Sequence, residues 1–190
     1  ELRGEHRLVI ESLPVDDEPR IGLDYSDPLV AQVTWLSDDA AATSLRVGDF
    51  IIEVNGVRED KDRIVELLGT ATRLDILVCR PAPMRVHLKE GPTALPLGVD
   101  VHFEPDSRSL LVGGLKPHGA VVAWNAEHPE RCVVPFDRIV SANGVGPDEN
   151  GIAGLLEVLR RQKTLDLHIV RPHVALLDRA KEPKAPRVTF

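Results

Sequence analysis

The chain carries the same series of phrases twice, and this repeat constrains its fold more than any other feature. The stretch GDFIIEVNGV (Gly48–Val57) is answered by FDRIVSANGV (Phe136–Val145). Three further pairs keep the same order: RIGLDY with PLGVDV, LVAQVTWL with LLVGGLKP, and LDILVCRP with LDLHIVRP. The second copy has 12 more residues between Gly98 and Asn143 than the first has between Gly22 and Asn55. Insertions confined to connections are typical of a duplicated domain, so we predict two units, residues 1–81 and 82–172.

Each copy is predicted to contain five to six short strands and two helices. Turn-forming residues separate the strands, and the Asn-Gly pair in each opening phrase is the strongest short signal for a hairpin. After it comes the clearest helix of each copy, where apolar residues of the second copy recur at i, i+3, i+4 and i+7 from Ile152. This pattern indicates the α+β class, with two small, partly open β-barrels. The proline-containing link at 81–83 predicts semi-rigid coupling between them.

The composition excludes several classes of protein. The chain is 43% hydrophobic but only 4% aromatic, which predicts aliphatic cores. Its net charge of -7 argues against a general nucleic-acid binder. No apolar run approaches the ~20 residues that cross a bilayer, and the first residues lack the apolar region of a signal peptide. Cys79 and Cys132 show no CxxC spacing, which favours a reducing, cytoplasmic location over a disulfide-built fold.

No pattern in the chain indicates catalysis. None of the seven histidines pairs with another His or with Cys at metal-ligand spacing. The GxSxG, Walker and HExxH signatures are absent from the sequence. Asp49 and Asp137, which lead the repeated strand, are expected to brace a turn. We therefore expect no enzyme activity, no catalytic residues, no metal and no cofactor.

The order of these phrases resembles that of the PDZ domain family over about residues 6–81 and 83–172. The stretch LRVGDFIIEVNGV (Leu45–Val57) is similar to the usual sequence motif of this family. The second copy is divergent, because Phe-Asp replaces Gly-Asp and the 12-residue insertion precedes its Asn-Gly. The element order is similar to that of eukaryotic scaffold PDZ domains and differs from the permuted order of bacterial protease PDZ domains.

The resemblance implies that each unit binds the C-terminus of another protein in a groove between its second strand and second helix. The peptide would join the edge of that strand by backbone hydrogen bonds. Backbone amides would hold its carboxylate, and they come from two triplets, Ile21-Gly22-Leu23 and Leu97-Gly98-Val99. Each glycine is expected to permit unusual backbone angles. Arg20 would add positive charge to the first site, whereas no basic residue adjoins the second triplet in sequence.

The resemblance also places residues of the second helix on the ligand side of each groove. These are Lys61, Val65 and Leu68 in the first copy, and Ile152, Leu156 and Leu159 in the second. Val65 and Leu68, together with Ile21 and Leu23, would form a socket for the ligand's last side chain. The first residue of this helix would contact the ligand side chain two residues before the ligand's last one. There, Lys61 would favour an acidic or hydrogen-bonding side chain, and Ile152 would favour an apolar one.

The leading hypothesis is a cytoplasmic adaptor or scaffold whose partners are C-termini or internal strand segments of other proteins. A tandem structural or dimerisation module with occluded grooves is an alternative, and so is a regulatory PDZ fragment of a larger enzyme. The segment 173–190 is expected to form a flexible tail. Its apolar ending, Val188-Thr189-Phe190, offers a further alternative, self-association through the tail.

Overall fold

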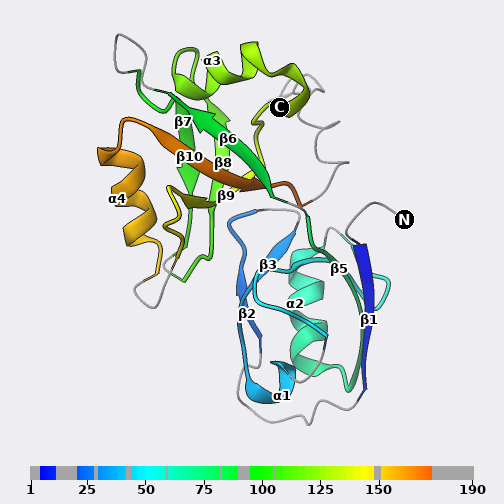
Figure 1. The fold of residues 1–190 in the computed structure, drawn as a ribbon. Helices are drawn as coiled ribbons and strands as arrows, with labels where there is room; N and C mark the ends of the chain where they lie inside the picture. The colour runs from blue at the N-terminus through cyan, green and yellow to red at the C-terminus, as the bar shows by residue number, and fades with distance from the viewer. Residues whose placement is uncertain are drawn as a thin grey trace, which may run out of the picture.

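The structure is a computed structural model in which two five-stranded antiparallel sheets lie one above the other (Figure 1). It describes residues 5–11, 21–27, 30–41, 44–58, 60–81, 83–89, 95–104, 106–147 and 151–172. Arg20 and the segment 173–190 lie outside the described residues. The sheets draw on residues 5–79 and 84–170, and the proposed boundary at 81/82 falls between them.

The two units contain the same elements in the same order. The first has β1 (Glu5–Glu11), β2 (Ile21–Asp24), β3 (Ala31–Leu36), α1 (Asp38–Ala41), β4 (Phe50–Val54), α2 (Lys61–Thr70) and β5 (Arg73–Cys79). The second has β6 (Met84–Leu88), β7 (Val99–His102), β8 (Leu110–Leu115), α3 (Ala120–Glu127), the 3-10 helix η1 (Pro129–Arg131), β9 (Arg138–Ala142), α4 (Ala153–Arg161) and β10 (Leu165–Val170). The extra residues of the second copy lengthen its first helix from four to eight residues and add η1.

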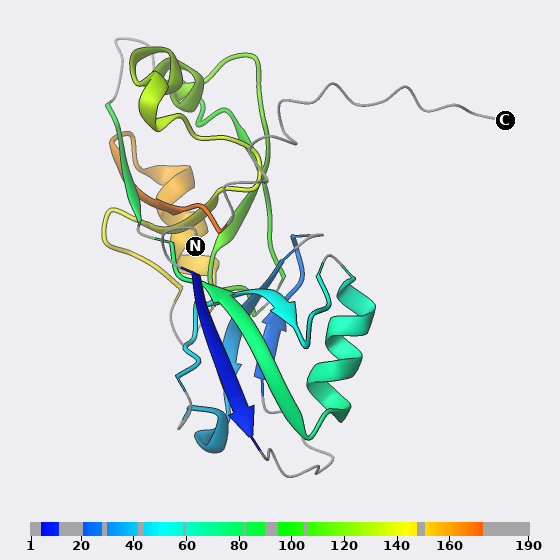
Figure 2. The same ribbon diagram turned by 90° about the vertical axis from the view of Figure 1, so that its right-hand side faces the viewer.

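Both sheets are open, and among the described residues each outer strand pairs on one side only. The strand orders are β1-β5-β4-β3-β2 and β6-β10-β9-β8-β7, so that β2 and β7 each pair with one neighbour only. Figure 2 shows β1 beside β5 and α2 on the other side of the first unit. The α+β class and the five strands per unit are confirmed. The description as partly open barrels is loose, because the outer strands of a sheet do not pair with each other among the described residues.

The repeated Asn-Gly pairs form matching two-residue turns. Asn55 and Gly56 have φ of 49° and 81°, and Asn143 and Gly144 have 51° and 79°. Positive φ at both central positions is the mark of the tight hairpin turn that suits the twist of paired strands. Each Asn side chain then accepts a hydrogen bond from an amide of the last strand of its unit, at 2.8 and 2.7 Å. The phrase therefore recurs for structural reasons.

The repeated aspartates brace the chain, as expected. Asp49 binds the guanidinium of Arg80 at 2.6 and 2.8 Å, and Asp137 binds that of Arg171 at 2.7 and 2.8 Å. Each carboxylate also accepts an amide hydrogen bond from the preceding turn. Burial raises the pKa of Asp137, although the pairing with Arg171 opposes that shift. Each unit thus ties its fourth strand to the end of its fifth.

Each unit has an aliphatic core of its own, and a third cluster lies between the units. Ile64 of α2 packs on the first sheet, and Leu155 of α4 packs on the second. In the third cluster, Phe50 and Leu77 of the first unit pack with Val170 of the second. Since Phe50 is 1% exposed, the junction is a packed interface.

A buried charge lies in the same interface. Arg138 of β9 and Asp24 of β2 are both 0% exposed, and Nη1 of Arg138 donates to the Asp24 carboxylate at 2.8 Å. The same guanidinium donates to Ser109 and Gln32 through Nη1, and to Ser26 through Nη2, at 3.2 to 3.4 Å. A buried ion pair of this kind is stable only when hydrogen bonds satisfy its remaining groups. Asp24, Gln32 and Ser26, which are most of the hydrogen-bond partners of Arg138, belong to the first unit.

Further hydrogen bonds cross the interface beside this pair. Ser107 donates to the Asp24 carboxylate at 2.7 Å, and Arg108 donates to the carbonyl of Thr34 at 3.1 Å. Burial by itself would raise the pKa of Asp24. Arg138 and the hydrogen bonds from Ser26 and Ser107 outweigh burial and hold that pKa below its ordinary value. The two units are therefore joined by hydrogen bonds and a buried ion pair as well as by the link at 81–83.

Among the described helices, none is both long and apolar enough to cross a membrane. The described residues also hold no group of three or more His, Cys, Asp or Glu side chains placed to bind a metal ion.

Candidate functional site

The candidate sites lie at the two exposed sheet edges, β2 and β7. An edge strand presents unpaired backbone N–H and C=O groups, to which another extended chain can add. The second helix of each unit accompanies its edge strand: Lys61 at the start of α2 contacts Tyr25 just after β2, and Leu159 of α4 shares a pocket with Leu97 just before β7. Both edges therefore have the two walls that the resemblance requires.

The glycine bend before β7 is locked in a left-handed conformation. Gly98 has φ of 79° and is buried. A Cβ at this position would lie 2.8 Å from the backbone of both His118 and Gly119, so only glycine fits. The start of α3 fixes the bend further, because the amides of Ala120 and Val121 donate to the carbonyls of Pro96 and Leu97.

This locking leaves the donors of the bend unused. The carbonyl of Gly98 accepts a hydrogen bond from the Lys116 amide at 2.9 Å. The amides of Leu97 and Gly98 donate to no other described residue. Successive backbone amides with no acceptor form a concavity suited to an anion. The bend can therefore accept a carboxylate, as the resemblance implies for this triplet.

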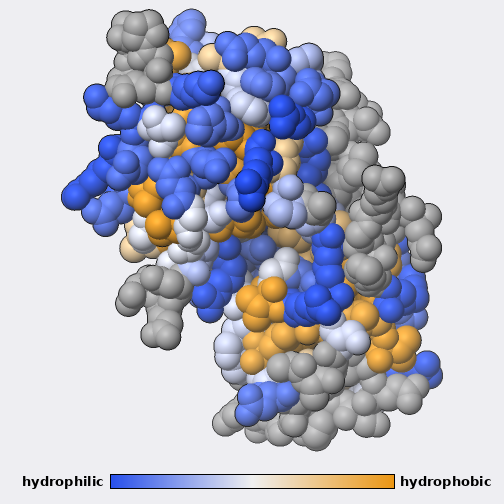
Figure 3. Space-filling view, in the orientation of Figure 1, coloured by the Kyte–Doolittle hydropathy of each residue, from blue (hydrophilic) through white to orange (hydrophobic). Residues whose placement is uncertain are grey.

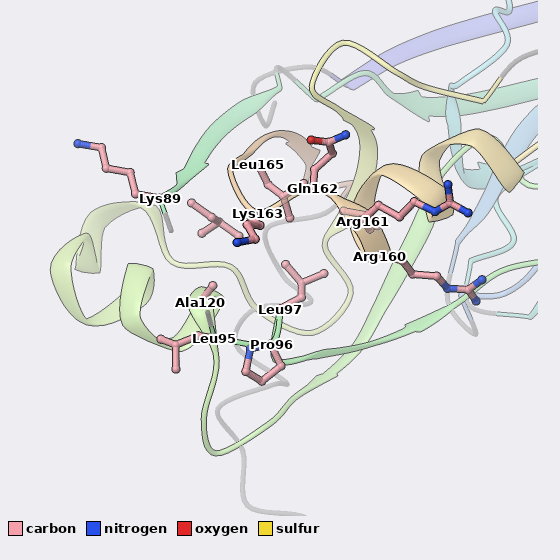
Figure 4. A pocket seen from close by; sticks show the side chains of 12 residues that line it. Lys89, Leu95, Pro96, Leu97, Ala120, Arg160, Arg161, Gln162, Lys163 and Leu165 are labelled. Atoms are coloured by element: carbon pink, nitrogen blue, oxygen red, sulfur yellow. The ribbon is translucent and has the colours of Figure 1, made fainter. Parts of the chain in front are cut away.

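A pocket of about 360 Å³ opens beside the bend (Figure 4). Its apolar lining includes Leu88, Leu95, Pro96, Leu97, Leu159 and Leu165. Its basic and amide lining comprises Lys89, Arg160, Arg161, Gln162 and Lys163. In Figure 4, Leu97 and Leu165 lie at the centre, and Arg160 and Arg161 project from the last turn of α4. The pocket combines an apolar floor with a basic margin.

The charged side chains of described residues that line this pocket are all basic. Arg161 pairs with Glu157 at 2.9 Å on the exposed face of α4, while Arg160 has no ion-pair partner in the described part of the chain. Sequence reasoning found no basic residue at this site because it considered only the neighbours of the triplet. The signal was present in RRQK (160–163), directly after Leu159 of the helix that the resemblance places beside the ligand.

The glycine of the first unit serves a different purpose. Gly22 lies inside β2 opposite Trp35, and its φ is outside the left-handed region. A Cβ there would lie 2.9 Å from Thr34 Oγ1 and 3.0 Å from Trp35 Cβ. The expectation of an unusual backbone at both glycines is therefore right for Gly98 and wrong for Gly22. At Gly22 the side chains of β3 leave no room for a larger residue.

The first unit has apolar side chains at its surface beside β2 and α2, and a lysine bridges the two elements at one end. Figure 3 shows hydrophobic side chains at the surface of the lower unit, over β2 and α2. Val65 of α2 is 43% exposed there. At the far end, Nζ of Lys61 lies 3.4 Å from the carbonyl oxygen of Tyr25 and 4.5 Å from the centre of its ring. Lys61 thus links the start of α2 to the end of β2.

The start of α2 at Lys61 is well defined. Asp60 caps the helix, since its carboxylate accepts a hydrogen bond from the amide of Arg63 at 3.0 Å. Lys61 is therefore the first residue of the helix, where the resemblance places it. The space beneath Lys61 and Tyr25 measures only about 10 Å³, which leaves no room for a ligand side chain there.

The other proposed ligand contacts differ in how much surface they present. Half-buried at the margins of the two cores are Ile21, Leu23, Leu68, Leu97, Val99, Leu156 and Leu159. Ile152, at the start of α4, is only 6% exposed and belongs to the second core. Arg20 lies outside the described residues. Leu156 and Leu159 therefore offer more side-chain surface to a ligand than Ile152 does.

No protein-family model matches the chain, and no curated protein matches it either. Among solved structures, a complex of INAD PDZ45 with NORPA CC-PBM is 15% identical, with 88% of this chain and 90% of that chain covered at a TM-score of 0.38. INAD PDZ45 in complex with an NG2 peptide is also 15% identical, with 88% of each chain covered and a TM-score of 0.36. TM-scores this low carry no weight for the site, which is argued from the chain's own geometry.

Proposed function

We propose that this protein is a PDZ-like interaction adaptor that binds C-terminal or strand-forming peptides of other proteins. The peptide adds to the edge of β7 beside α4, and a second peptide can add to β2 beside α2. One observation carries the proposal: the amides of Leu97 and Gly98 donate to no other described residue, and the bend that holds them adjoins a pocket with a basic margin at the start of an edge strand.

Three interactions would hold a chain end in the second groove. Backbone pairing with β7 supplies affinity that does not depend on sequence. The terminal carboxylate accepts hydrogen bonds from the bend, in the field of Arg160 and its basic neighbours. The last side chain enters the apolar floor formed by Leu97 and Leu159. Together these contacts suit a modest affinity of about micromolar, or roughly -8 kcal/mol.

A second candidate function is that of a rigid spacer or dimerisation module. The bridge from Lys61 to Tyr25 and the buried interface around Arg138 favour it, because both reduce the freedom of the first groove. This function requires the groove along β7 to be filled by another part of the assembly. Peptide binding at β7 therefore discriminates between the two functions.

The test is a titration of the full chain with short peptides that end in a free carboxylate or in an amide. Nuclear magnetic resonance follows the amides of Leu97 and Gly98. We expect the free-acid peptide to shift both signals, and the amidated peptide to bind at least about tenfold more weakly, since the loss of a charged hydrogen-bond acceptor costs roughly 1.5–3 kcal/mol.

Two matched variants identify which of the two grooves binds the peptide. Leu159→Lys places a charge on the floor of the second groove, and Val65→Lys does the same on α2 of the first. We expect Leu159→Lys to abolish the shifts at the bend and Val65→Lys to leave them unchanged. Equal binding of the acid and the amide, or full binding by Leu159→Lys, would refute the proposal.

A further inference from the structure

The groove along β7 does not end in open solvent at its upstream end. A hollow of about 400 Å³ lies there, lined by residues of both units. The second unit contributes Val101, His102, Phe103 and Glu104, and the first contributes Tyr25 and Ser26. The end of β7 therefore opens onto the segment that follows β2.

The two sides of this hollow are held at a fixed separation. Ser107 accepts a hydrogen bond from the Glu104 amide at 2.7 Å and donates one to the Asp24 carboxylate at 2.7 Å. On the other side, Ser26 accepts a hydrogen bond from Arg138. One serine thus connects the segment after β7 to the end of β2, and the hollow is part of the packed junction.

The direction of the proposed ligand leads its chain into this hollow. A peptide with its carboxylate at the Gly98 bend runs antiparallel to β7 and toward that bend, so its upstream residues extend along β7 away from the bend. Strand β7 has four residues, so the part of the peptide that pairs with it is about four residues long. The next residues upstream then leave β7 at Phe103 and Glu104, which line the hollow.

The lining of the hollow favours a cationic side chain. Phe103 is 41% exposed and offers an aromatic face, and the exposed carboxylate of Glu104 lies next to it in the chain. Among the described residues that line the hollow, none is Lys or Arg. On the side of the first unit, Nζ of Lys61 lies 4.5 Å from the centre of the Tyr25 ring, which shows that this ring can make a cation–π contact.

Resting on the function proposed above, we propose that the first unit takes part in recognising the ligand of the second. The occupant of the hollow is the upstream part of the same C-terminal tail, with Lys or Arg about five to seven residues before its end. That side chain lies against Phe103 and Tyr25 and pairs with Glu104. Partners are therefore selected by a basic residue upstream of the terminal carboxylate.

The test compares two free-acid peptides that share their last five residues, measured by calorimetry on the full chain. One is five residues long, and the other is ten residues long with Arg at the sixth position from the end. We expect the longer peptide to bind about five times more tightly. Glu104→Lys should erase this gain and shift the preference to a ten-residue peptide with Glu at that position. Asp106→Lys, a charge change outside the hollow, should preserve the gain.

Participation of the first unit has a probe of its own, because Tyr25 is the only tyrosine in the chain. With labelled tyrosine in the Val65→Lys background, we expect its ring signals to shift with the ten-residue peptide and stay unchanged with the five-residue one. Equal affinity of the two peptides, or an unmoved Tyr25 signal, would overturn this inference and leave the proposed function intact. Failure of both peptides to bind would overturn both.

Discussion

The two grooves differ in chemistry although they are built from the same repeated phrases. The first is apolar, has a glycine of ordinary conformation inside β2, and is bridged at its far end by Lys61. The second has a left-handed glycine before β7, unused amides and a basic-margined pocket. The sequence of the first copy is more similar to the usual PDZ motif, yet the second copy has the arrangement better suited to a carboxylate. Sequence similarity to the motif thus indicates the sheet and the turns more than it indicates the binding site.

The units also depend on each other at the ends of their edge strands. Asp24 ends β2, and its charge is balanced by Arg138 of the other unit at 2.8 Å. The comparison between the grooves therefore holds only while the interface is intact. The following predictions separate the contribution of each unit, starting with the largest effect.

Removing Asp24 should have the largest effect. Asp24→Ala leaves the guanidinium of Arg138 buried without its charge partner, which costs about 3–5 kcal/mol in the free energy of unfolding. Denaturant unfolding measures this loss. Asp100→Ala is the matched control, because Asp100 pairs with Lys116 at the surface, where both side chains are more than half exposed, and such pairs contribute about 0–1 kcal/mol. Similar losses for the two variants would mean that the interface does not hold the units together.

The two glycines should respond unequally to alanine. Gly98→Ala combines a left-handed backbone with contacts of 2.8 Å to other backbone atoms, so we expect a loss of about 2–5 kcal/mol and of binding at β7. Gly22→Ala meets side-chain atoms at 2.9 and 3.0 Å, which can move, so we expect about 1–3 kcal/mol. Thermal unfolding of both variants provides the measurement. A larger loss at Gly22 would reverse the distinction drawn between the two bends.

Acid should weaken the junction between the units. The pKa of Asp24 is lower in the folded protein than its ordinary value of 3.8, so the unfolded chain takes up the proton first. The stability that this carboxylate contributes is therefore fully present above about pH 4–5 and is lost as the pH falls through the lowered pKa. Unfolding measured between pH 7 and pH 2 should show this loss in the parent protein. Asp24→Asn should lack that part of the pH dependence, and an identical profile would contradict the assignment.

The smallest effect is expected at the closed end of the first groove. Lys61→Ala removes the contact with Tyr25, so a peptide with an apolar side chain two residues from its end should bind about two to five times more tightly there. A peptide with Glu at that position should bind more weakly, because its charge partner is gone. Calorimetry in the Leu159→Lys background isolates this groove. Unchanged affinity for both peptides would show that Lys61 plays no part in recognition.

Local sequence patterns were sufficient to predict much of the fold. The Asn-Gly turns were predictable because positive φ at two successive positions is costly for most other residues. The strand and helix order followed from hydrophobic periodicity, and the bracing role of Asp49 and Asp137 follows from the turn beside each. The predicted description as partly open barrels was too loose for two open sheets, because whether outer strands meet depends on the twist and curvature of the whole sheet rather than on any one strand.

The site was predictable only in part. The Gly98 bend and the helix wall at Leu159 were predicted from the resemblance to the PDZ domain family. The basic margin was missed, since Arg160 is separated from Gly98 by most of the second unit in sequence and meets the bend only after the sheet has formed. In the same way, an arginine in an apolar strand gives no sign of its partner, and Arg138 met Asp24 through the packing of one unit on the other.

By itself, the sequence determined the duplication, the order of the elements and the turns, because these depend on the conformational preferences of neighbouring residues and on the alternation of apolar positions. Tertiary structure alone decided that the sheets stay open, that Arg138 is buried against Asp24, and that the two grooves differ in charge. These features depend on distances between residues far apart in the chain, and electrostatic interactions and burial are set by such distances.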